Sequence, residues 1–354
     1  MHASAAPVEA YALQAGDVVA DRDTVLSIWR GNLGEQAHMR AKYEWFYLRC
    51  PFGAPVLQLL RHVPGGDIAG TCAAGRRRML WRGRDLQAGV MVDLAVRAEH
   101  RSLGPALTMQ KGLIQSSLER FGFVYGFPNA RATAIFRRLG ARKLADIVRH
   151  ACVLRPGIYL RRRFPVFVAA PLGAMLGLAL RAREAIRRVG APRLHATWSD
   201  RADPRMDDLW ARSDPGTGLL AVRDAGRLRW RFDEAPLAKT RYLLLSAGGG
   251  DRLEAWFATQ VVDDVLHVRD FWSVDAATGV GTTWLDALIA AARRLGVAAV
   301  SVELATREGM LADWRARGFV ERSRRPIYAF WKPEFDPGED ESFDLLFTSA
   351  DEDE

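Results

Sequence analysis

Cysteine is nearly absent from this chain, which argues against cysteine-ligated metal sites and disulfide bridges. The three cysteines, Cys50, Cys72 and Cys152, lie far apart in 354 residues and show neither metal-site spacing nor a paired disulfide pattern. We therefore expect reduced thiols and no metal centre. The first twenty residues also lack the basic start and apolar run of a secretory signal. Together these absences predict a cytoplasmic protein.

Lysine is scarce as well, because arginine supplies 45 of the 50 basic side chains. The net charge of +8 is unevenly spread, since residues 334–354 hold ten acidic and no basic side chains. The remaining basic body favours anionic partners such as nucleotides or acidic lipids, or else carries its arginines on solvated faces. We do not expect nucleic acid as a partner. The acidic end is predicted either as a solvated tail or as a strand lying on the basic body.

Charge is missing altogether from the 17 residues between Phe164 and Leu180, which arginines flank on both sides. At about 1.5 Å per residue a helix of this length is slightly short for a bilayer, and two prolines and two glycines interrupt it. One interpretation is a helix packed between two domains. The other is a membrane-surface anchor, in which residues 161–188 make peripheral contact with anionic lipid. We do not expect a true crossing.

A repeat organises the rest of the chain. The pattern Trp-x-aromatic-x-x-x-Pro occurs at 45–51 and again at 230–236, and two further pairs of short patterns follow at separations of 177 and 178 residues. Two similar units separated by this distance predict a tandem arrangement. The expected organisation is a first domain at 1–150, a basic and apolar linker at 151–195, a second domain at 196–333 and the acidic tail at 334–354.

The chemistry is concentrated between Val90 and Gly140. An apolar run at 90–96 predicts a buried strand, and a helical pattern begins near Pro105 after a basic glycine turn. A second strand at 123–127 and a second helix at 130–138 follow. A strand, glycine turn and helix in this order can hold a phosphate on the free N–H groups of the first helical turn.

This span resembles the GCN5-related N-acetyltransferase (GNAT) superfamily. The family's motif Leu-x-Val-x-x-x-x-Arg/Gln-x-x-Gly-x-Gly/Ala is matched here by Leu94, Val96, Arg101, Gly104 and Ala106. Its motif Asn-x-x-Ala-x-x-x-Tyr-x-x-x-Gly is matched by Asn129, Ala132, Phe136 and Gly140, so that a phenylalanine replaces the tyrosine. The resemblance covers residues 20–150 well and residues 200–330 as a degraded copy.

The resemblance implies an α/β fold of the α+β type: two GNAT-like domains in tandem, each a central, mostly antiparallel sheet flanked by helices. It also implies an acyl-CoA, most simply acetyl-CoA, as co-substrate. Similar tandem proteins include bacterial acyltransferases of polysaccharide or envelope biosynthesis, which implies a small-molecule, sugar, glycan or envelope-related acceptor. The residues implied to bind the acyl-CoA are Leu94, Ala95, Val96, Arg101, Ser102, Leu103, Gly104, Pro105, Ala106 and Asn129.

Acyl transfer needs a group that takes a proton from the attacking amine or hydroxyl. Asp93 on the central strand is the predicted base, although a carboxylate at a strand end can also be purely structural. Because Phe136 cannot donate a proton, Tyr125 is the predicted substitute for the family's tyrosine, with Tyr43 or water as alternatives. Four further side chains stay open as bases, namely Glu44, His62, Glu99 and His100.

The second copy departs further from both motifs. Ala276 stands where arginine or glutamine is expected, Arg307 replaces the asparagine and Trp314 replaces the tyrosine. We therefore predict one working acyl-CoA site and a second domain that is structural or binds the acceptor. Two other interpretations stay open. One is a transferase resembling the FemABX group, which uses aminoacyl-tRNA, and the other is a non-catalytic protein that binds CoA or a partner.

Overall fold

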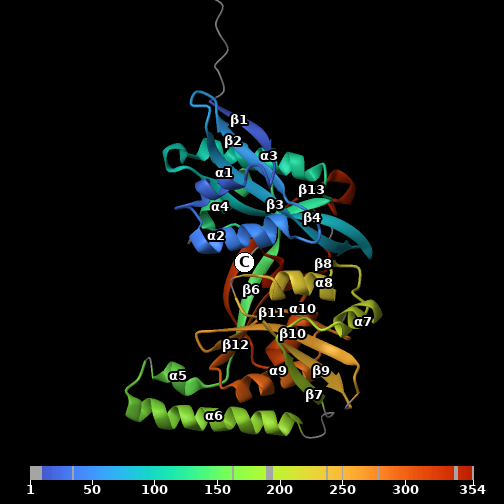
Figure 1. Cartoon of the computed structure of the whole chain (residues 1–354). Coiled ribbons are helices and arrows are strands. Elements are labelled where there is room, and N and C mark those ends of the chain that lie inside the picture. Colours follow the sequence, from blue (N-terminus) through green and yellow to red (C-terminus); the bar gives the residue numbers. More distant parts are fainter. Residues whose placement is uncertain are drawn as a thin grey trace, which may run out of the picture.

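A computed structural model describes residues 10–33, 36–161, 163–188, 194–236, 238–248, 250–276, 279–338 and 342–352. In this part of the chain, 14 strands form one continuous sheet that runs through both halves of the molecule (Figure 1). Most neighbouring strands are antiparallel, and helices cover the sheet. The predicted mixed and mostly antiparallel α/β fold is confirmed.

The first half contains a sheet edge, an aromatic helical segment and the unit that the motifs predict. Its elements are β1 (Tyr11–Gly16), α1 (Arg22–Trp29), α2 (Gln36–Lys42), the π-helix η1 (Tyr43–Leu48), β2 (Val56–His62), β3 (Ile68–Trp81), β4 (Arg84–Val96), η2 (Ala98–His100), α3 (Leu103–Leu118), β5 (Phe123–Gly126), α4 (Ala130–Arg138) and β6 (Arg142–Val153). Then α5 (Pro156–Leu160) and α6 (Val166–Arg188) lead to the second half.

The second half repeats this order almost element by element. Its elements are β7 (Leu194–Ser199), α7 (Arg205–Arg212), β8 (Leu219–Ala221), α8 (Ala225–Leu228), the π-helix η3 (Arg229–Asp233), β9 (Arg241–Ala247), β10 (Leu253–Val262), β11 (Val265–Ser273), α9 (Thr282–Leu295), β12 (Ala299–Thr306), α10 (Glu308–Ala316), β13 (Val320–Trp331), η4 (Pro333–Phe335), β14 (Leu345–Thr348) and η5 (Ser349–Asp351). Only β8, β14 and the last short turns have no counterpart among the described elements of the first half. The predicted tandem arrangement is therefore present in the fold.

Local chemistry explains several of these boundaries. The helix predicted at 130–138 is α4, which Asn129 caps by accepting the backbone N–H of Ala132 at 3.0 Å. Gly140 follows it with a φ of 81°, the left-handed conformation typical of a helix end. β3 ends at Trp81 because Arg82 and Gly83, both with positive φ, make a two-residue hairpin turn into β4.

The two halves exchange their last strands. β13 of the second half lies between β5 and β6, while β6 of the first half pairs with β12. β6 and β13 are equivalent strands of the two copies, and they pair antiparallel along nearly their whole length. An antiparallel pair of equivalent strands is the arrangement of a two-fold axis. The predicted limit at residue 150 falls inside β6, so the halves share a sheet instead of meeting at a linker.

The repeated tryptophan pattern lies at the same axis. Trp45 and Trp230 stack with ring centroids 5.1 Å apart, and each indole N–H donates to the backbone carbonyl of the other residue, at 2.6 and 3.3 Å. Arg77 of β3 lies over Trp230, and Arg231 lies over Trp45. All four side chains are buried. The repeat thus brings together two equivalent aromatic segments that hold the halves against each other.

The segment predicted as a linker does not lie between the halves. Figure 1 shows α5 and α6 beside α9, at the outer end of the second half. Gly157 of α5 and Gly173 of α6 lie in close contact, and a side chain at Gly173 would clash with the backbone of Gly157. The interpretation of the uncharged stretch as a helix packed between two domains is therefore wrong, because one side of α6 faces solvent along its whole length.

Candidate active site

A gap opens between β4 and β5 of the first half. The two parallel strands pair from Ala88–Phe123 to Val90–Tyr125 and then separate. Beyond Val90, β4 pairs with β3 alone among the described strands, so its other edge presents backbone N–H and C=O groups. β4 also bulges here, and Asp93 within the bulge has a φ of 54°. Bulges of this kind redirect side chains beside active sites.

A cavity of about 790 Å³ lies at this gap. Its walls combine apolar and aromatic side chains with seven polar or charged ones, namely His38, Lys42, Asp93, Gln110, Asn129, Gln260 and Arg269. Most of the wall comes from α1, α2, β4, α3 and α4 of the first half, while the second half contributes Ala238, Gln260 and Arg269. The cavity therefore belongs mainly to the first half and is closed on one side by residues of the second.

Two buried polar atoms on this wall have no hydrogen-bond partner among the described residues. They are the Gln110 amide oxygen on α3 and the Trp29 indole N–H on α1. A buried donor or acceptor without a partner costs about 1–3 kcal/mol, so natural proteins rarely leave one unless a ligand or water completes it. Both atoms are buried beneath the cavity surface, so a bound molecule would reach them only if neighbouring side chains moved.

Asp93, the predicted base, lies on the cavity wall with its side chain 4% exposed. One carboxylate oxygen pairs with the Lys42 ammonium at 2.8 Å, and the other accepts the Tyr47 hydroxyl at 2.9 Å. Each carboxylate oxygen therefore has a partner that can orient it. Lys42 lines the cavity as well. The site thus contains a carboxylate held in place by a cation and a phenol.

The predicted phosphate-binding turn stands at the start of α3. Ser102 precedes the helix in an extended conformation, and no side chain caps the first helical turn. A side chain at Gly104 would meet no atom within 4 Å, so packing does not require glycine there. Arg101 reaches the Val96 carbonyl at 3.2 Å and the Asn32 side chain at 2.7 Å. Open space and uncapped N–H groups fit an anionic ligand.

The other predicted binding residues divide between the cavity and its support. Leu94 and Asn129 line the cavity. Ala95 and Val96 are buried on β4, and Pro105 and Ala106 belong to the first turn of α3, which Leu103 begins.

Phe136 also lines the cavity, at the position where the family motif has tyrosine. No tyrosine is among the described residues of the wall, and the phenol of Tyr47 reaches the site through its hydrogen bond to Asp93.

Tyr125 is not at the cavity. It is fully buried on β5, and its hydroxyl donates to the backbone carbonyl of Asp351 at 2.9 Å. Burial raises the pKa of this phenol. Tyr43 is buried too, and its hydroxyl donates to the Val18 carbonyl. The prediction of Tyr125 as proton donor does not agree with these contacts, because its hydroxyl already donates to the backbone carbonyl of Asp351.

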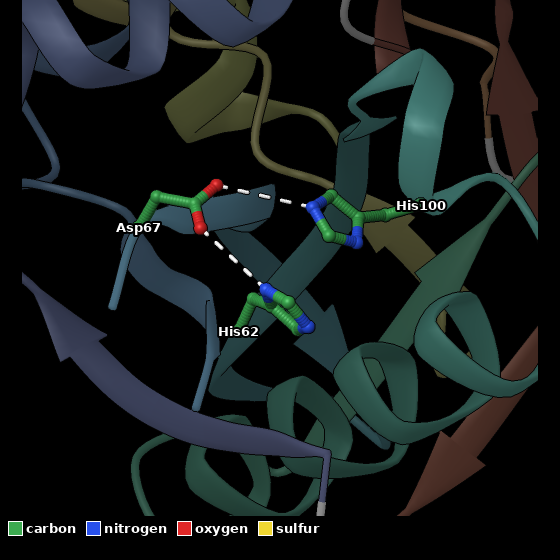
Figure 2. A group of neighbouring side chains, drawn as sticks. All are labelled: His62, Asp67 and His100. Carbon is green, nitrogen blue, oxygen red and sulfur yellow. Dashed lines mark ion pairs between the residues drawn. The ribbon is translucent and has the colours of Figure 1, made fainter. Parts of the chain in front are cut away.

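The histidines left open as bases form a separate cluster (Figure 2). Asp67 lies between them, 3.6 Å from His62 Nδ1 and 3.8 Å from His100 Nε2, and both pairs are ionic only when the imidazoles are protonated. Their ligand atoms all lie within 4.8 Å of one another. Zn²⁺ binds imidazole nitrogen at about 2.0–2.1 Å, so a cation would require the three groups to move closer. In the observed arrangement these contacts hold His100, the residue before Arg101, in place.

The remaining open carboxylates face solvent. Glu44 is half-exposed and pairs with Arg22, and Glu99 is exposed in η2. Neither lines the cavity. The residues that sequence patterns missed are Lys42, Tyr47, Trp29 and Gln110. Lys42 had one usable signal, since it is one of only five lysines in the chain.

The equivalent gap of the second half is filled. β11 and β12 pair from Val265–Ala299 to Val268–Val302 and then separate, as β4 and β5 do. Here β14 of the acidic tail pairs with β12 from Leu304–Thr348 onward. A hollow of about 50 Å³ remains beside it. Of the two interpretations of the tail, the strand lying on the basic body is the one observed, while residues 339–341 and 353–354 lie outside the described part.

Buried charges hold this tail in place. Asp270, the counterpart of Asp93, pairs with Arg223 at 2.9 Å and with Arg227 at 3.0 Å. Arg227 also pairs with Asp351 of the tail at 2.7 Å. All four side chains are almost completely buried. Burial disfavours the Asp270 carboxylate, but the two guanidinium groups outweigh it and hold its pKa below the usual range.

Comparison with known proteins places this architecture. No protein-family model matches the sequence, and no curated protein matches it either. A probable N-acyltransferase from Enterococcus faecalis is similar in structure, with a TM-score of 0.63, 10% identity and coverage of 91% of this chain and 72% of that one. GCN5-related N-acetyltransferases from Anabaena variabilis and Kribbella flavida have TM-scores of 0.58 and 0.56, identities of 10% and 12%, and coverage of 90% and 91% of this chain and 72% and 71% of theirs. The chain has the fold of the GCN5-related N-acetyltransferases, extending over both of its halves.

Proposed function

We propose that the protein transfers an acyl group, most simply acetyl, from acyl-CoA to a nitrogen or oxygen of a small-molecule or glycan acceptor. One observation carries the proposal: the gap between β4 and β5 is open in the first half and leads to a cavity of about 790 Å³ with Asp93 on its wall. The GNAT fold supports an acyl-CoA-dependent reaction in general. The acceptor class rests on the size and polarity of the cavity.

The acyl-CoA would lie along the free edge of β4. Backbone groups from Met91 to Val96 can hydrogen-bond the amide-containing arm of CoA, since no described strand covers that edge. The pyrophosphate would be bound by the first N–H groups of α3, beside Gly104, where the helix dipole favours negative charge. Both elements continue from the same strand, which places the thioester end at the Asp93 bulge.

The chemistry at the bulge follows from three groups. Asp93 would take a proton from the acceptor amine or hydroxyl as it attacks the thioester carbonyl carbon. A backbone N–H of the bulge would stabilise the oxyanion. The carbon–sulfur bond then breaks, and the CoA thiolate leaves and is protonated by water or by the Lys42 ammonium. The absence of a tyrosine at Phe136 makes a thiolate leaving group beside a cation the simplest arrangement.

The acceptor would bind against the wall supplied by the second half. Gln260 donates its amide to the Thr240 hydroxyl at 2.9 Å, which leaves its amide oxygen facing a fixed direction. Arg269 adds a cation to the same wall. Hydroxyl-rich or anionic small molecules suit these groups.

A second candidate function is CoA binding without catalysis. It is favoured by the lack of a phenolic acid on the cavity wall and by the contacts that Lys42 and Tyr47 already make with Asp93. Both functions require acyl-CoA to bind, and only transfer requires turnover.

Calorimetric titration with acetyl-CoA, followed by measurement of free CoA thiol with a panel of amino-sugar, amine and hydroxyl acceptors, tests the proposal. Binding with acceptor-dependent thiol release is the expected result. Binding without release for any acceptor would favour the non-catalytic function. No binding at all would overturn both and leave a donor other than acyl-CoA, such as the aminoacyl-tRNA of FemABX-like enzymes.

A further inference from the structure

The helix α6 has an exposed apolar side. Its residues from Val166 to Glu184 are long and apolar enough to cross a membrane, yet only 6% of the 18-residue window is buried in the protein. A core helix passing the same test would be mostly buried, and a signal sequence would lie near the N-terminus. α6 is neither, because it lies at the outer end of the second half (Figure 1).

One stripe of α6 packs on the body. Ala169 and Gly173 are buried, and Glu184 accepts hydrogen bonds from Arg293 of α9 at 2.6 and 2.8 Å. Arg187 donates to the Ala316 carbonyl of α10 at 3.1 Å. These residues recur at the spacing of one helix face. The C-terminal half of α6 is therefore fastened along the second half.

The opposite stripe is apolar and faces outward. Phe167 is 80% exposed, Met175 61%, Leu178 69% and Ile186 73%. At about 100° per residue these four side chains fall within an arc of about 100° on the helix. A helix side that faces water is normally polar, and a continuous apolar patch marks an interaction surface.

Arginines surround this apolar arc. Arg161 and Arg163 precede α6 near the exposed Phe164, and Arg181 and Arg183 lie on its two flanks. Two hollows of about 310 and 330 Å³ lie where α6 meets the sheet and α9. Their walls, on the packed side of α6, carry a single acidic side chain, Glu184, and the arginines 155, 181, 183, 187, 293, 294, 317 and 322, of which Arg293 pairs with Glu184 and Arg317 with Asp286. An apolar arc between cationic flanks is complementary to an anionic lipid surface.

We propose that α6 is an interfacial helix that attaches the protein to an anionic bilayer, with the outward stripe inserted at the level of the head groups and the arginines on lipid phosphates. The helix lies on the membrane and does not cross it, because a crossing helix would have to leave its contacts with α9 and α10. A protein kept in the cytoplasm meets such a surface at the inner leaflet. Attachment is independent of acyl transfer, since α6 contributes nothing to the cavity wall.

Vesicle flotation of the full chain tests this attachment. The vesicles contain either phosphatidylcholine alone or phosphatidylcholine with about one third phosphatidylglycerol. We expect recovery in the floating fraction with the anionic vesicles and not with the neutral ones, and release at high salt. Recovery that is equal and low with both would overturn the proposal.

Two variants locate the contact. The triple change Phe167→Ser, Leu178→Ser and Ile186→Ser should reduce partitioning at least about tenfold, because the apolar contribution is lost. A matched control, Val261→Ser with Val262→Ser, removes two valines that are 55% and 51% exposed on β10 and should leave partitioning unchanged. Equal loss in both variants would contradict attachment through α6.

Two further readouts separate attachment from other outcomes. Unchanged acetyl-CoA titration and thermal unfolding in the triple variant would show that its fold and its cavity are intact. Light scattering reports the alternative occupant of the apolar stripe. If the wild-type chain dimerises in solution, fails to float, and becomes monomeric with the triple change, then the stripe binds a second copy and the membrane proposal is wrong.

Discussion

Both halves contain a gap between two diverging strands, but the gap is open in the first half and filled in the second. In the first half the strands separate beyond Val90 and leave a cavity of about 790 Å³, whereas in the second half they separate beyond Val268 and the chain's own tail leaves about 50 Å³. In both halves the gap is a consequence of two strands that diverge. The second gap is filled by a strand from the same chain. A ligand in the first gap would make similar hydrogen bonds to the free backbone groups there.

An ion pair lies beside each of the two gaps. Lys42 and Arg227 lie 185 residues apart, as Trp45 and Trp230 do, and each pairs with the aspartate of its own gap, Asp93 or Asp270. An ion pair shared by both halves supports the bulged strand in each. Only in the first half does the carboxylate also lie on an open cavity wall, which is why the proposed proton transfer is assigned to Asp93.

The largest effect should come from Asp93→Asn. An amide cannot accept the acceptor's proton, so kcat should fall by about 10²–10⁴-fold while the affinity for acetyl-CoA stays within about twofold. Thiol-release kinetics and calorimetry measure the two quantities. Asp85→Asn is the matched control, because Asp85 lies on the same strand with its side chain 61% exposed. Full activity of the Asp93 variant would mean that Asp93, like Asp270, has a structural role.

The second-largest effect concerns the filled gap. Asp351→Ala leaves the buried Arg227 without one of its two carboxylates, and we expect a loss of about 3–5 kcal/mol in the free energy of unfolding. Urea denaturation measures this loss. Asp344→Ala, which removes an exposed partner of Arg307, should cost less than about 1 kcal/mol. Similar values for both variants would show that the tail is not fastened by its buried end.

Gly104→Glu tests the binding turn of the open gap. The new carboxylate would occupy the space above the first turn of α3 and repel phosphate, so acetyl-CoA affinity should fall at least about a hundredfold, which is about 2.7 kcal/mol. The fold should tolerate it, because a side chain at this position meets no protein atom within 4 Å. Gly309→Glu at the start of α10 is equally unobstructed and serves as the control. Undiminished binding would place the phosphate elsewhere.

The pH dependence of unfolding distinguishes the two aspartates further. The pKa of Asp270 is lowered in the folded protein from an ordinary value of 3.8. Its stabilising contribution is therefore complete above that value and is lost as the pH falls below about 4, by up to about 1.4 kcal/mol for each pH unit. Urea denaturation between pH 6 and 3 should show a shallower acid loss in Asp270→Asn than in the wild type. Equal slopes would assign the acid sensitivity to other carboxylates.

Tyr47→Phe should have the smallest effect. The second half already has Phe232 at this position in the repeat, so the ring packs without its hydroxyl. Removing the bond to Asp93 should cost about 0.5–1.5 kcal/mol and lower kcat/KM by up to about tenfold. A larger loss would give the phenol a direct part in proton transfer.

Local patterns predicted the parts of this molecule that local chemistry determines. The helix α4 has the predicted limits, 130–138, and the predicted residues Asp93, Leu94 and Asn129 all lie on the wall of one cavity. The strand exchange and the inserted tail could not be predicted, because no periodicity records which distant edge a strand will join. Arg77 was equally hidden, because nothing in a run of three arginines shows that one of them is buried with its guanidinium over Trp230.

The distribution of charge in the sequence indicated only some of the ionic contacts in the fold. An acidic tail and a basic body allowed contact between them as one of two alternatives, but did not indicate that Asp351 would reach two buried arginines of the second gap. Lys42 escaped notice for a related reason, since its partner Asp93 is 51 residues away. Pairs of this kind become visible only when the sheet has brought their strands together.

The stoichiometry of acetyl-CoA binding tests the central claim most directly. Calorimetric titration of the full chain should give one site per molecule, because the first gap is open and the tail occupies the second. Two equivalent sites would contradict the account by showing that β14 yields to the ligand. No site would contradict it by showing that the open gap of the first half does not hold acyl-CoA.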